Sequence, residues 1–395
     1  MRERVSERQE RILALVRQRG RMRVADLARE MAVSAVTARR DVETLARQGA
    51  LRRSHGIAIA VNAASGWADS PMEPLVGRGV PGWRESRSPA TPVIGMVVPT
   101  APYYYADVIR GARAAVTEAN GRLVVGITNY DIDEERAQIR QMQARGVNAL
   151  LLTPAWPTGT SPDDEADRAA GLSVPTVLVE RRGKLGVPVG ELDRVCSAHA
   201  HGSYLAVRHL VQLGRRQVAL IARGSPTAAQ LELGFHAALQ HLDVPSSAGL
   251  VCTTGPRPET TEIEAILAAV VDRARRGEVD AALVHTDQDA VYFVQQLQRH
   301  GLRVPDDVAV VAYDDELAAL ADPPLTAVAP PRFAVGQAAA RLALSRLAER
   351  YRAVPGTARA PRHHLDLLPE LRVRESCGVG RSRMSGLIDR SNALD

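Results

Sequence analysis

The 395-residue sequence predicts an α/β protein with a small, mainly helical N-terminal domain and a larger body of two parallel-sheet lobes. Three observations lead to this prediction. Apolar residues recur at helical spacing over roughly the first 48 residues, and a short hairpin pattern follows them. From residue 92 onward, apolar strand patterns alternate with helical patterns, as in repeated βα units. A stretch rich in glycine, proline and serine lies between the two regions and divides them into domains.

The N-terminal domain, residues 1–60, reads as three short helices followed by a hairpin. Residues 6–19, 24–31 and about 35–48 each place apolar side chains on one helical face. Glycines at 20 and 49 end the first and third helices. Residues 51–60 have the pattern of a two-stranded wing. Three helices and a wing make a small winged helix-turn-helix domain.

Positive charge is concentrated in the N-terminal domain, residues 1–60, which forms the head of the protein. Residues 1–60 contain 14 arginines and 7 acidic residues, so they carry +7, whereas the whole chain carries +5. The remaining residues therefore carry −2. A basic head on a nearly neutral body indicates that the head binds a polyanion and the body does something else.

The third helix has the composition expected of a helix that enters a DNA groove. Ser34 can cap the helix, and small and hydroxyl side chains at its start let the backbone approach the bases. Paired arginines then reach phosphates or guanine edges, and Val36 can touch a thymine methyl group. We expect double-stranded DNA to be contacted by Ser34, Val36, Thr37, Arg39 and Arg40 on this helix and by Arg52, Arg53 and His55 in the wing.

The connecting segment 61–91 reads as a flexible linker. Glycine, proline and serine supply 12 of the 30 positions from 62 to 91, which favours an unstructured chain. Residues 379–395 are polar and are expected to form a disordered tail.

The body, residues 92–378, contains two successive sets of strand and helix patterns. Strands are expected at 93–98, 123–127, 149–152 and 176–179, and a second set at 218–221, 250–252, 281–284 and 308–312. Two such sets predict two Rossmann-like lobes, which bind a ligand between them at the carboxyl ends of the strands.

Several classes of function are disfavoured. The longest apolar runs fall well short of the roughly 20 residues of a membrane span, so no membrane partner is expected. Cys196, Cys252 and Cys377 have neither disulfide nor metal-site spacing, which suits a reducing compartment, and no metal or cofactor is expected. The first strand is followed by Pro99 and Pro102 in place of a GxGxxG loop, and no P-loop or nucleophile elbow occurs. We therefore expect no catalytic residues. The protein is expected to be cytoplasmic, and nucleoid-associated when bound to DNA.

The head resembles the DeoR-type winged helix-turn-helix. The resemblance spans residues 5–60 and is carried by residues 8–13, 24–28, 33–41 and 49–56. Relatives have a second glycine after the His-Gly of the wing, where this chain has Ile57. The resemblance implies a DNA-reading domain.

The body resembles the effector domain of LacI/GalR-type repressors, which is related to periplasmic sugar-binding proteins. The matching segments are residues 104–111, 202–210, 301–308, 310–315, 323–328 and 371–374. The resemblance implies a type I periplasmic-binding-protein-like fold whose chain crosses between lobes three times. It places the N-lobe at 92–187 and 330–356, and the C-lobe at 190–328 and 359–378.

The same resemblance implies ligand contacts between the lobes. Aromatic rings and carboxylates there suit a sugar, because rings stack on its faces and carboxylates accept bonds from its hydroxyls. The implied ligand-binding residues are Tyr104, Tyr105, Glu180, Arg181, Asp287 and Asp314. Three positions depart from the family pattern: Leu231 stands for an arginine, Thr286 for an asparagine, and Ala198-His199 for Asp-Asn.

These features together predict a transcriptional regulator that represses a carbohydrate uptake or catabolic operon. It would bind its operator as a homodimer, and a sugar or sugar derivative between the lobes would control its affinity. The alternatives are a regulator that responds to nucleosides or purines, a Rossmann-like enzyme, and a transport-linked sugar-binding protein.

Overall fold

A computed structural model describes most of the chain in two units. The described residues are 8, 11–16, 21–31, 33–47, 51–54, 57–60, 91–155, 171–183, 186–256, 260–352 and 360–379. The chain divides into Met1–Trp83 and Arg84–Asp395, and each unit is described by itself. The expected linker, apart from residue 91, and the expected tail, apart from residue 379, lie outside the described residues.

The head packs short helices against a small sheet. Its elements are helical residues at 8 and 11–16, then β1 (Arg21–Arg23), α2 (Val24–Glu30), α3 (Ala35–Arg47), β2 (Leu51–Ser54) and β3 (Ile57–Ala60). The strands are antiparallel in the order β1-β3-β2. Ile12, Leu27 and Val42 are fully buried in its core, so the helical faces expected from the apolar spacing do face inward. Strand β1 was not foreseen, because three residues carry too little pattern to reveal a strand formed by pairing with β3.

The N-lobe contains a six-stranded parallel sheet in the order β14-β8-β7-β6-β4-β5. Its strands are β4 (Val93–Val98), β5 (Arg122–Ile127), β6 (Ala149–Leu152), β7 (Thr176–Val179), β8 (Asp193–Ser197) and β14 (His364–Leu367). Helices α4 (Tyr104–Glu118) and α11 (Arg332–Arg352) pack on one face. Helix α5 (Ile132–Ala144) packs on the other.

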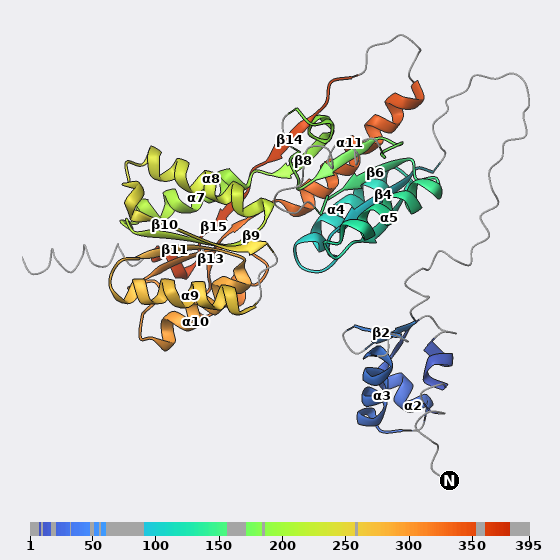
Figure 1. Ribbon diagram of the computed structural model, residues 1–395, viewed down its shortest axis with the longest axis horizontal. Coiled ribbons are helices and arrows are strands. Elements are labelled where there is room, and N and C mark those ends of the chain that lie inside the picture. Colours follow the sequence, from blue (N-terminus) through green and yellow to red (C-terminus); the bar gives the residue numbers. More distant parts are fainter. Residues whose placement is uncertain are drawn as a thin grey trace, which may run out of the picture. The chain divides into compact units, whose positions relative to one another are not determined.

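The C-lobe repeats this plan with the strand order β10-β9-β11-β12-β13-β15. Its strands are β9 (Val218–Gly224), β10 (Gly249–Pro256), β11 (Ala281–His285), β12 (Ala309–Tyr313), β13 (Thr326–Ala329) and β15 (Glu370–Arg372), and only β15 is antiparallel to its neighbour. Helices α7 (His199–Gln212) and α8 (Pro226–His241) cover one face, and α9 (Thr260–Arg275) and α10 (Asp287–Arg299) cover the other (Figure 1).

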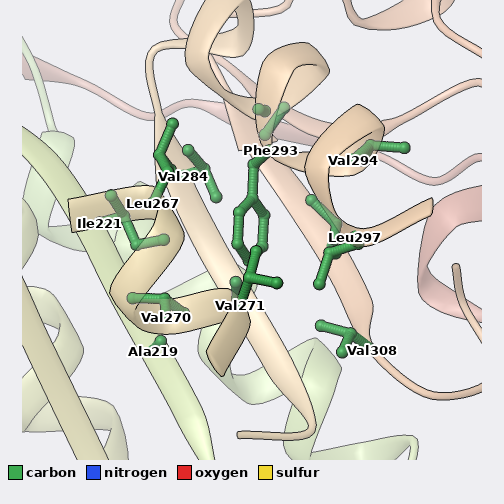
Figure 2. Packing of buried hydrophobic residues seen from close by; sticks show 14 of the residues in the cluster. Ala219, Ile221, Leu267, Val270, Val271, Val284, Phe293, Val294, Leu297 and Val308 are labelled. Atoms are coloured by element: carbon green, nitrogen blue, oxygen red, sulfur yellow. The ribbon is translucent and has the colours of Figure 1, made fainter. Parts of the chain in front are cut away.

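The α9–α10 side of the C-lobe is a hydrophobic core. Phe293 is fully buried and lies among Leu267, Val271 and Leu297 (Figure 2). Burial of side chains of this size stabilises a fold by about 1.5–3 kcal/mol each. The core therefore holds the carboxyl end of β11 and the start of α10 in fixed positions.

Close helix packing in the N-lobe depends on two glycines. A Cβ atom on Gly111 of α4 would lie 1.9 Å from the carbonyl oxygen of Phe333, and one on Gly336 of α11 would lie 1.9 Å from that of Val108. The two helices meet backbone to backbone, which fixes the start of α11 beside α4.

The expected lobe boundaries are wrong at two strands. Strands β8 and β14 were assigned to the C-lobe, but both pair in the N-lobe sheet. The first crossing therefore follows Ser197, ten residues or so later than expected. Strand β8 escaped notice because it is polar: Asp193 is fully buried and accepts two 2.8 Å bonds from Arg346. A charged residue normally indicates an exposed position, so the sequence of β8 does not predict a buried strand when the partner of Asp193 lies far away in the chain.

Neither membrane nor metal features are found in the described part of the chain. No helix there has the length and apolar character to cross a bilayer. Likewise, no group of three or more metal-ligating side chains is found among those residues.

Candidate functional site

The start of α3 is organised by two hydroxyl side chains. Ser34 caps the helix, because its Oγ accepts a 3.1 Å bond from the Thr37 N–H. The two hydroxyls also lie 2.8 Å apart. Ser34 is exposed and Thr37 half-buried, so both stay near the surface at the helix start. This end of α3 can approach another backbone closely.

Helix α3 is anchored by a buried ion pair on its inner face. Asp41 is 4% exposed, and its Oδ2 lies 2.6 Å from Nε of Arg8 in the first helix. The preceding residue, Arg40, is exposed. The ion pair therefore orients α3 so that Arg40 faces solvent.

The structure describes only part of the expected DNA-contacting set. The side chains of Val36, Arg39, Arg52 and Arg53, and all of His55, lie outside the described residues. Their contact with DNA stays a prediction.

In the body, Glu180 is the centre of a buried polar cluster at the end of β7. Its Oε1 accepts bonds from the hydroxyls of Tyr104 and Ser197, each at 2.7 Å. Its Oε2 accepts a 2.9 Å bond from the Ser197 N–H and lies 3.4 Å from Nε2 of His199. Burial alone raises the pKa of Glu180, but these contacts outweigh it and lower the pKa to about 2. Glu180 is therefore a buried, ionised acceptor.

His199 links this cluster to the C-lobe. It is 3% exposed, and its Nδ1 lies 2.9 Å from the hydroxyl of Tyr313 at the end of β12. Burial raises the pKa of Tyr313 well above its usual range, so its hydroxyl stays protonated. Tyr104, Glu180, His199 and Tyr313 thus form one continuous polar chain between the sheets.

Asp287, at the start of α10, is fully buried and already bonded. One carboxylate oxygen accepts a bond from the hydroxyl of Tyr103, which belongs to the N-lobe. The other accepts from the backbone N–H groups of Leu317 and Ala318. Asp287 is therefore an interlobe contact in this structure.

Asp314, immediately after β12, is the expected site residue with unused bonding capacity. It is 2% exposed, and its Oδ2 lies 3.7 Å from Nε2 of His285. Among the described residues, Asp314 Oδ1, His285 Nδ1 and Arg332 Nε are buried without a hydrogen-bond partner. Buried polar atoms are nearly always paired, so this trio is a candidate contact for a polar ligand or water.

Burial sets the protonation of this pair. It raises the pKa of Asp314 to about 7, against the opposing effect of Arg332. It lowers the pKa of His285 to about 4. Near neutral pH the imidazole is therefore neutral, and the carboxyl lies close to its titration point.

Two expected ligand contacts lie in the N-lobe interior. Arg181 donates to the carbonyl oxygens of Pro154 (3.2 Å) and Glu180 (2.8 Å), and Tyr105 is 5% exposed. Leu231 is fully buried in the C-lobe core.

Of the expected residues, the structure brings Tyr104 and Glu180 into direct contact. It places Asp287 at the start of α10 and Asp314 directly after β12, beyond the ends of two neighbouring C-lobe strands. It adds four residues that sequence reasoning had not assigned to the site: Tyr103, His199, Tyr313 and Arg332. Arg332 donates a 2.6 Å bond to the Asp314 carbonyl and lies 5.5 Å from the Tyr104 ring centroid. The only signal for any of them was the departure from the family pattern at His199.

The fold and these two sites define a class: a helix-turn-helix head joined to a two-lobed α/β domain. Family models match both parts, a DeoR-like helix-turn-helix domain at residues 8–64 and a periplasmic binding protein-like domain at residues 207–377.

Relatives extend this match over most of the body. The chain is 30% identical over 249 residues to the HTH-type transcriptional regulator CelR of Thermobifida fusca, covering 62% of this chain and 69% of that one. It is 24% identical over 265 residues to the arabinose metabolism transcriptional repressor of Geobacillus stearothermophilus, covering 66% and 71%.

Solved structures of transcriptional regulators have a similar fold. A putative LacI-family transcriptional regulator from Sanguibacter keddieii is 26% identical, with a TM-score of 0.59 and coverage of 72% of this chain and 98% of that one. A CelR–cellobiose complex is 24% identical, with a TM-score of 0.60 and coverage of 87% and 91%. The chain belongs to the LacI family of transcriptional regulators and carries a DeoR-like head. It is a DNA-binding regulator of transcription, and its relatives are regulators, not enzymes.

Proposed function

We propose that this regulator represses a carbohydrate uptake or catabolic operon and that a sugar bound between its lobes controls its affinity for the operator. The observation that carries the proposal is the buried polar cluster between the lobes. An ionised Glu180 and the incompletely bonded Asp314 supply the acceptors that vicinal hydroxyls need. The aromatic ring of Tyr104 lies beside them.

Some relatives and solved neighbours are linked to sugars by their names, whereas several other relatives are PurR repressors. One relative is named for arabinose metabolism, and solved neighbours contain cellobiose and ribose. Within the proposed site, Glu180, Asp314 and Tyr104 contact the ligand, while Arg181 and Tyr105 support the wall. Asp287 would take part only after release of Tyr103.

On the DNA side, we propose that Ser34, Thr37 and Arg40 of α3 contact the operator, together with Val36, Arg39 and the wing residues Arg52, Arg53 and His55. A homodimer would place two heads on half-sites roughly 34 Å apart. Light scattering of the full chain tests the dimer, and a monomer at micromolar concentration would contradict it.

The experiment for the ligand is a thermal-shift screen of the full chain followed by calorimetry. The panel contains arabinose, ribose, cellobiose and other sugars, with purines and nucleosides as the competing class. A sugar hit that Glu180→Gln abolishes supports the proposal, because the substitution removes a charged acceptor and keeps the shape. A hit confined to purines or nucleosides contradicts the sugar assignment, and no hit in either class contradicts a small-molecule sensor of these kinds.

A further inference from the structure

We infer that Tyr103 is an intrinsic latch that holds the two lobes together without a small molecule, by occupying the acceptor of Asp287. The inference goes beyond the proposed function, because it concerns a bond between the lobes and not the bound ligand. It rests on the hydrogen bonds of Asp287, on the backbone conformation of Tyr103 and on residues 314–318, which contact both Asp287 and Arg332.

The Tyr103–Asp287 bond joins elements of opposite lobes. Tyr103 precedes α4 of the N-lobe, whereas Asp287 begins α10 of the C-lobe. The tyrosine hydroxyl donates to Oδ1 of a carboxylate that is fully buried. A hydrogen bond to an ionised acceptor is roughly twice as strong as one between neutral groups. This single bond therefore contributes strongly to lobe closure.

The backbone of Tyr103 is held in an unfavourable conformation. Its φ of 58° and ψ of −126° lie outside the regions that non-glycine residues usually adopt. Such a conformation persists only where surrounding contacts over-determine it. The bond to Asp287 is one of the contacts that hold Tyr103 in place.

The C-lobe loop of residues 314–318 has two contacts with the N-lobe, one through Asp287 and one directly. Asp287 accepts from the N–H groups of Leu317 and Ala318, and Arg332 of the N-lobe lies 2.7 Å from Oε1 of Glu316. Residues 314–318 thus lie between two N-lobe contacts, Tyr103 through Asp287 and Arg332 directly. Arg332 directly follows a chain crossing, whereas Tyr103 and Asp287 are distant in sequence from every crossing. The tyrosine is therefore free to separate from its partner when the lobes move apart.

The latch has a consequence for ligand selection. A sugar hydroxyl that seeks Asp287 must displace the tyrosine hydroxyl, and one that seeks Glu180 must displace Tyr104 or Ser197, whereas Asp314 Oδ1 has no hydrogen-bond partner in the described part of the chain. Tyr103 thereby makes closure partly independent of ligand and directs the ligand toward Asp314.

A double-mutant cycle in the full chain tests the latch without any ligand. Tyr103→Phe removes the hydroxyl and Asp287→Ala removes its acceptor, and the equilibrium constant for unfolding of the body is measured in urea for each variant and the pair. We expect Tyr103→Phe to raise this constant about tenfold in the wild-type background and to have no effect beside Asp287→Ala. Asp287→Ala also removes the acceptor of the Leu317 and Ala318 N–H groups. This loss is present in both the Asp287→Ala variant and the double variant, so it cancels when those two are compared.

The matched control is Tyr204→Phe. The Tyr204 hydroxyl lies 2.8 Å from Nδ1 of His241, and both residues belong to the C-lobe. Its effect should be the same in either background. If Asp287→Ala does not fold, Asp287→Asn replaces it. Beside Asp287→Asn, Tyr103→Phe should raise the equilibrium constant for unfolding by only about threefold, because a bond to a neutral acceptor is about half as strong. An equal effect of Tyr103→Phe in both backgrounds, or none in either, would overturn the latch.

Discussion

The polar side chains of α3 and those between the lobes lie in opposite environments. On α3, Arg40 is exposed, and the side chain of Ser34 bonds to Thr37 within its own helix turn. Between the lobes, Glu180 and Asp287 are buried and bonded to residues from distant elements. A DNA-reading surface is complete before its partner arrives, whereas an interlobe site must exchange internal bonds for ligand bonds. Substitutions in the two regions should therefore affect different measurements.

Removal of the Glu180 carboxylate should have the largest effect, and on stability. Glu180→Ala leaves the Ser197 N–H and the hydroxyls of Ser197 and Tyr104 without this acceptor in a buried place. We expect a loss of about 3–5 kcal/mol in the free energy of unfolding of the body. Urea denaturation of the full chain measures it. The exposed Glu264→Ala is the control, and a similar small loss in both variants would refute the bonding described for Glu180.

The Asp314–His285 pair should give a pH signature. The folded pKa of His285, about 4, is below its ordinary 6.5, so its contribution to stability rises with pH between those values. The folded pKa of Asp314, about 7, is above its ordinary 3.8, so its contribution falls with pH over that range. The two trends oppose each other between pH 4 and 6.5.

Separate substitutions should reveal each trend. In Asp314→Asn the body should gain stability from pH 4 to 6.5, by up to about 3 kcal/mol. In His285→Gln it should lose stability over the same range. Urea denaturation at several pH values measures both. If the free energy of unfolding depends on pH in the same way in wild type and in both variants, burial does not shift the pKa values of Asp314 and His285.

On the head, Arg40→Ala should lower DNA affinity and leave the body unchanged. Loss of one arginine contact costs about 1–3 kcal/mol, which is roughly 5- to 150-fold in affinity. Fluorescence anisotropy with the chain's own promoter DNA measures it, and the salt dependence should decrease by about one counterion if the contact is to phosphate. Arg29→Ala on α2 is the control, because Arg29 is also exposed and pairs with Asp26. Equal losses in the two variants would argue against a specific role for Arg40.

The smallest effect should follow loss of the α3 cap. Ser34→Ala removes the acceptor of the Thr37 N–H and should cost the head about 1 kcal/mol. Ser34→Asp should keep the cap and the stability, yet weaken DNA binding because it adds a negative charge near phosphates. Thermal unfolding and anisotropy together separate the two roles. Equal DNA affinity of Ser34→Asp and wild type would remove Ser34 from the interface.

The sequence was informative where side-chain patterns are local. The capping serine, the inward face of α2 and eight of the twelve strands in the two lobes follow from spacing within a few residues, and the structure has them; β8, β13, β14 and β15 were not predicted. It was least informative where bonding joins distant segments. Asp193 looks like surface until Arg346 is seen beside it, and Tyr103 gains its role only from Asp287, 184 residues away. No local pattern contains such pairings.

A small molecule bound between the lobes is expected to change the affinity of the protein for DNA. The direct measurement is operator affinity of the full chain, by anisotropy at fixed salt, with and without the sugar identified by calorimetry. We predict a change of at least fivefold for wild type, which Glu180→Gln abolishes while it keeps the sugar-free affinity. A sugar that binds wild type tightly and leaves its operator affinity unchanged would contradict the account.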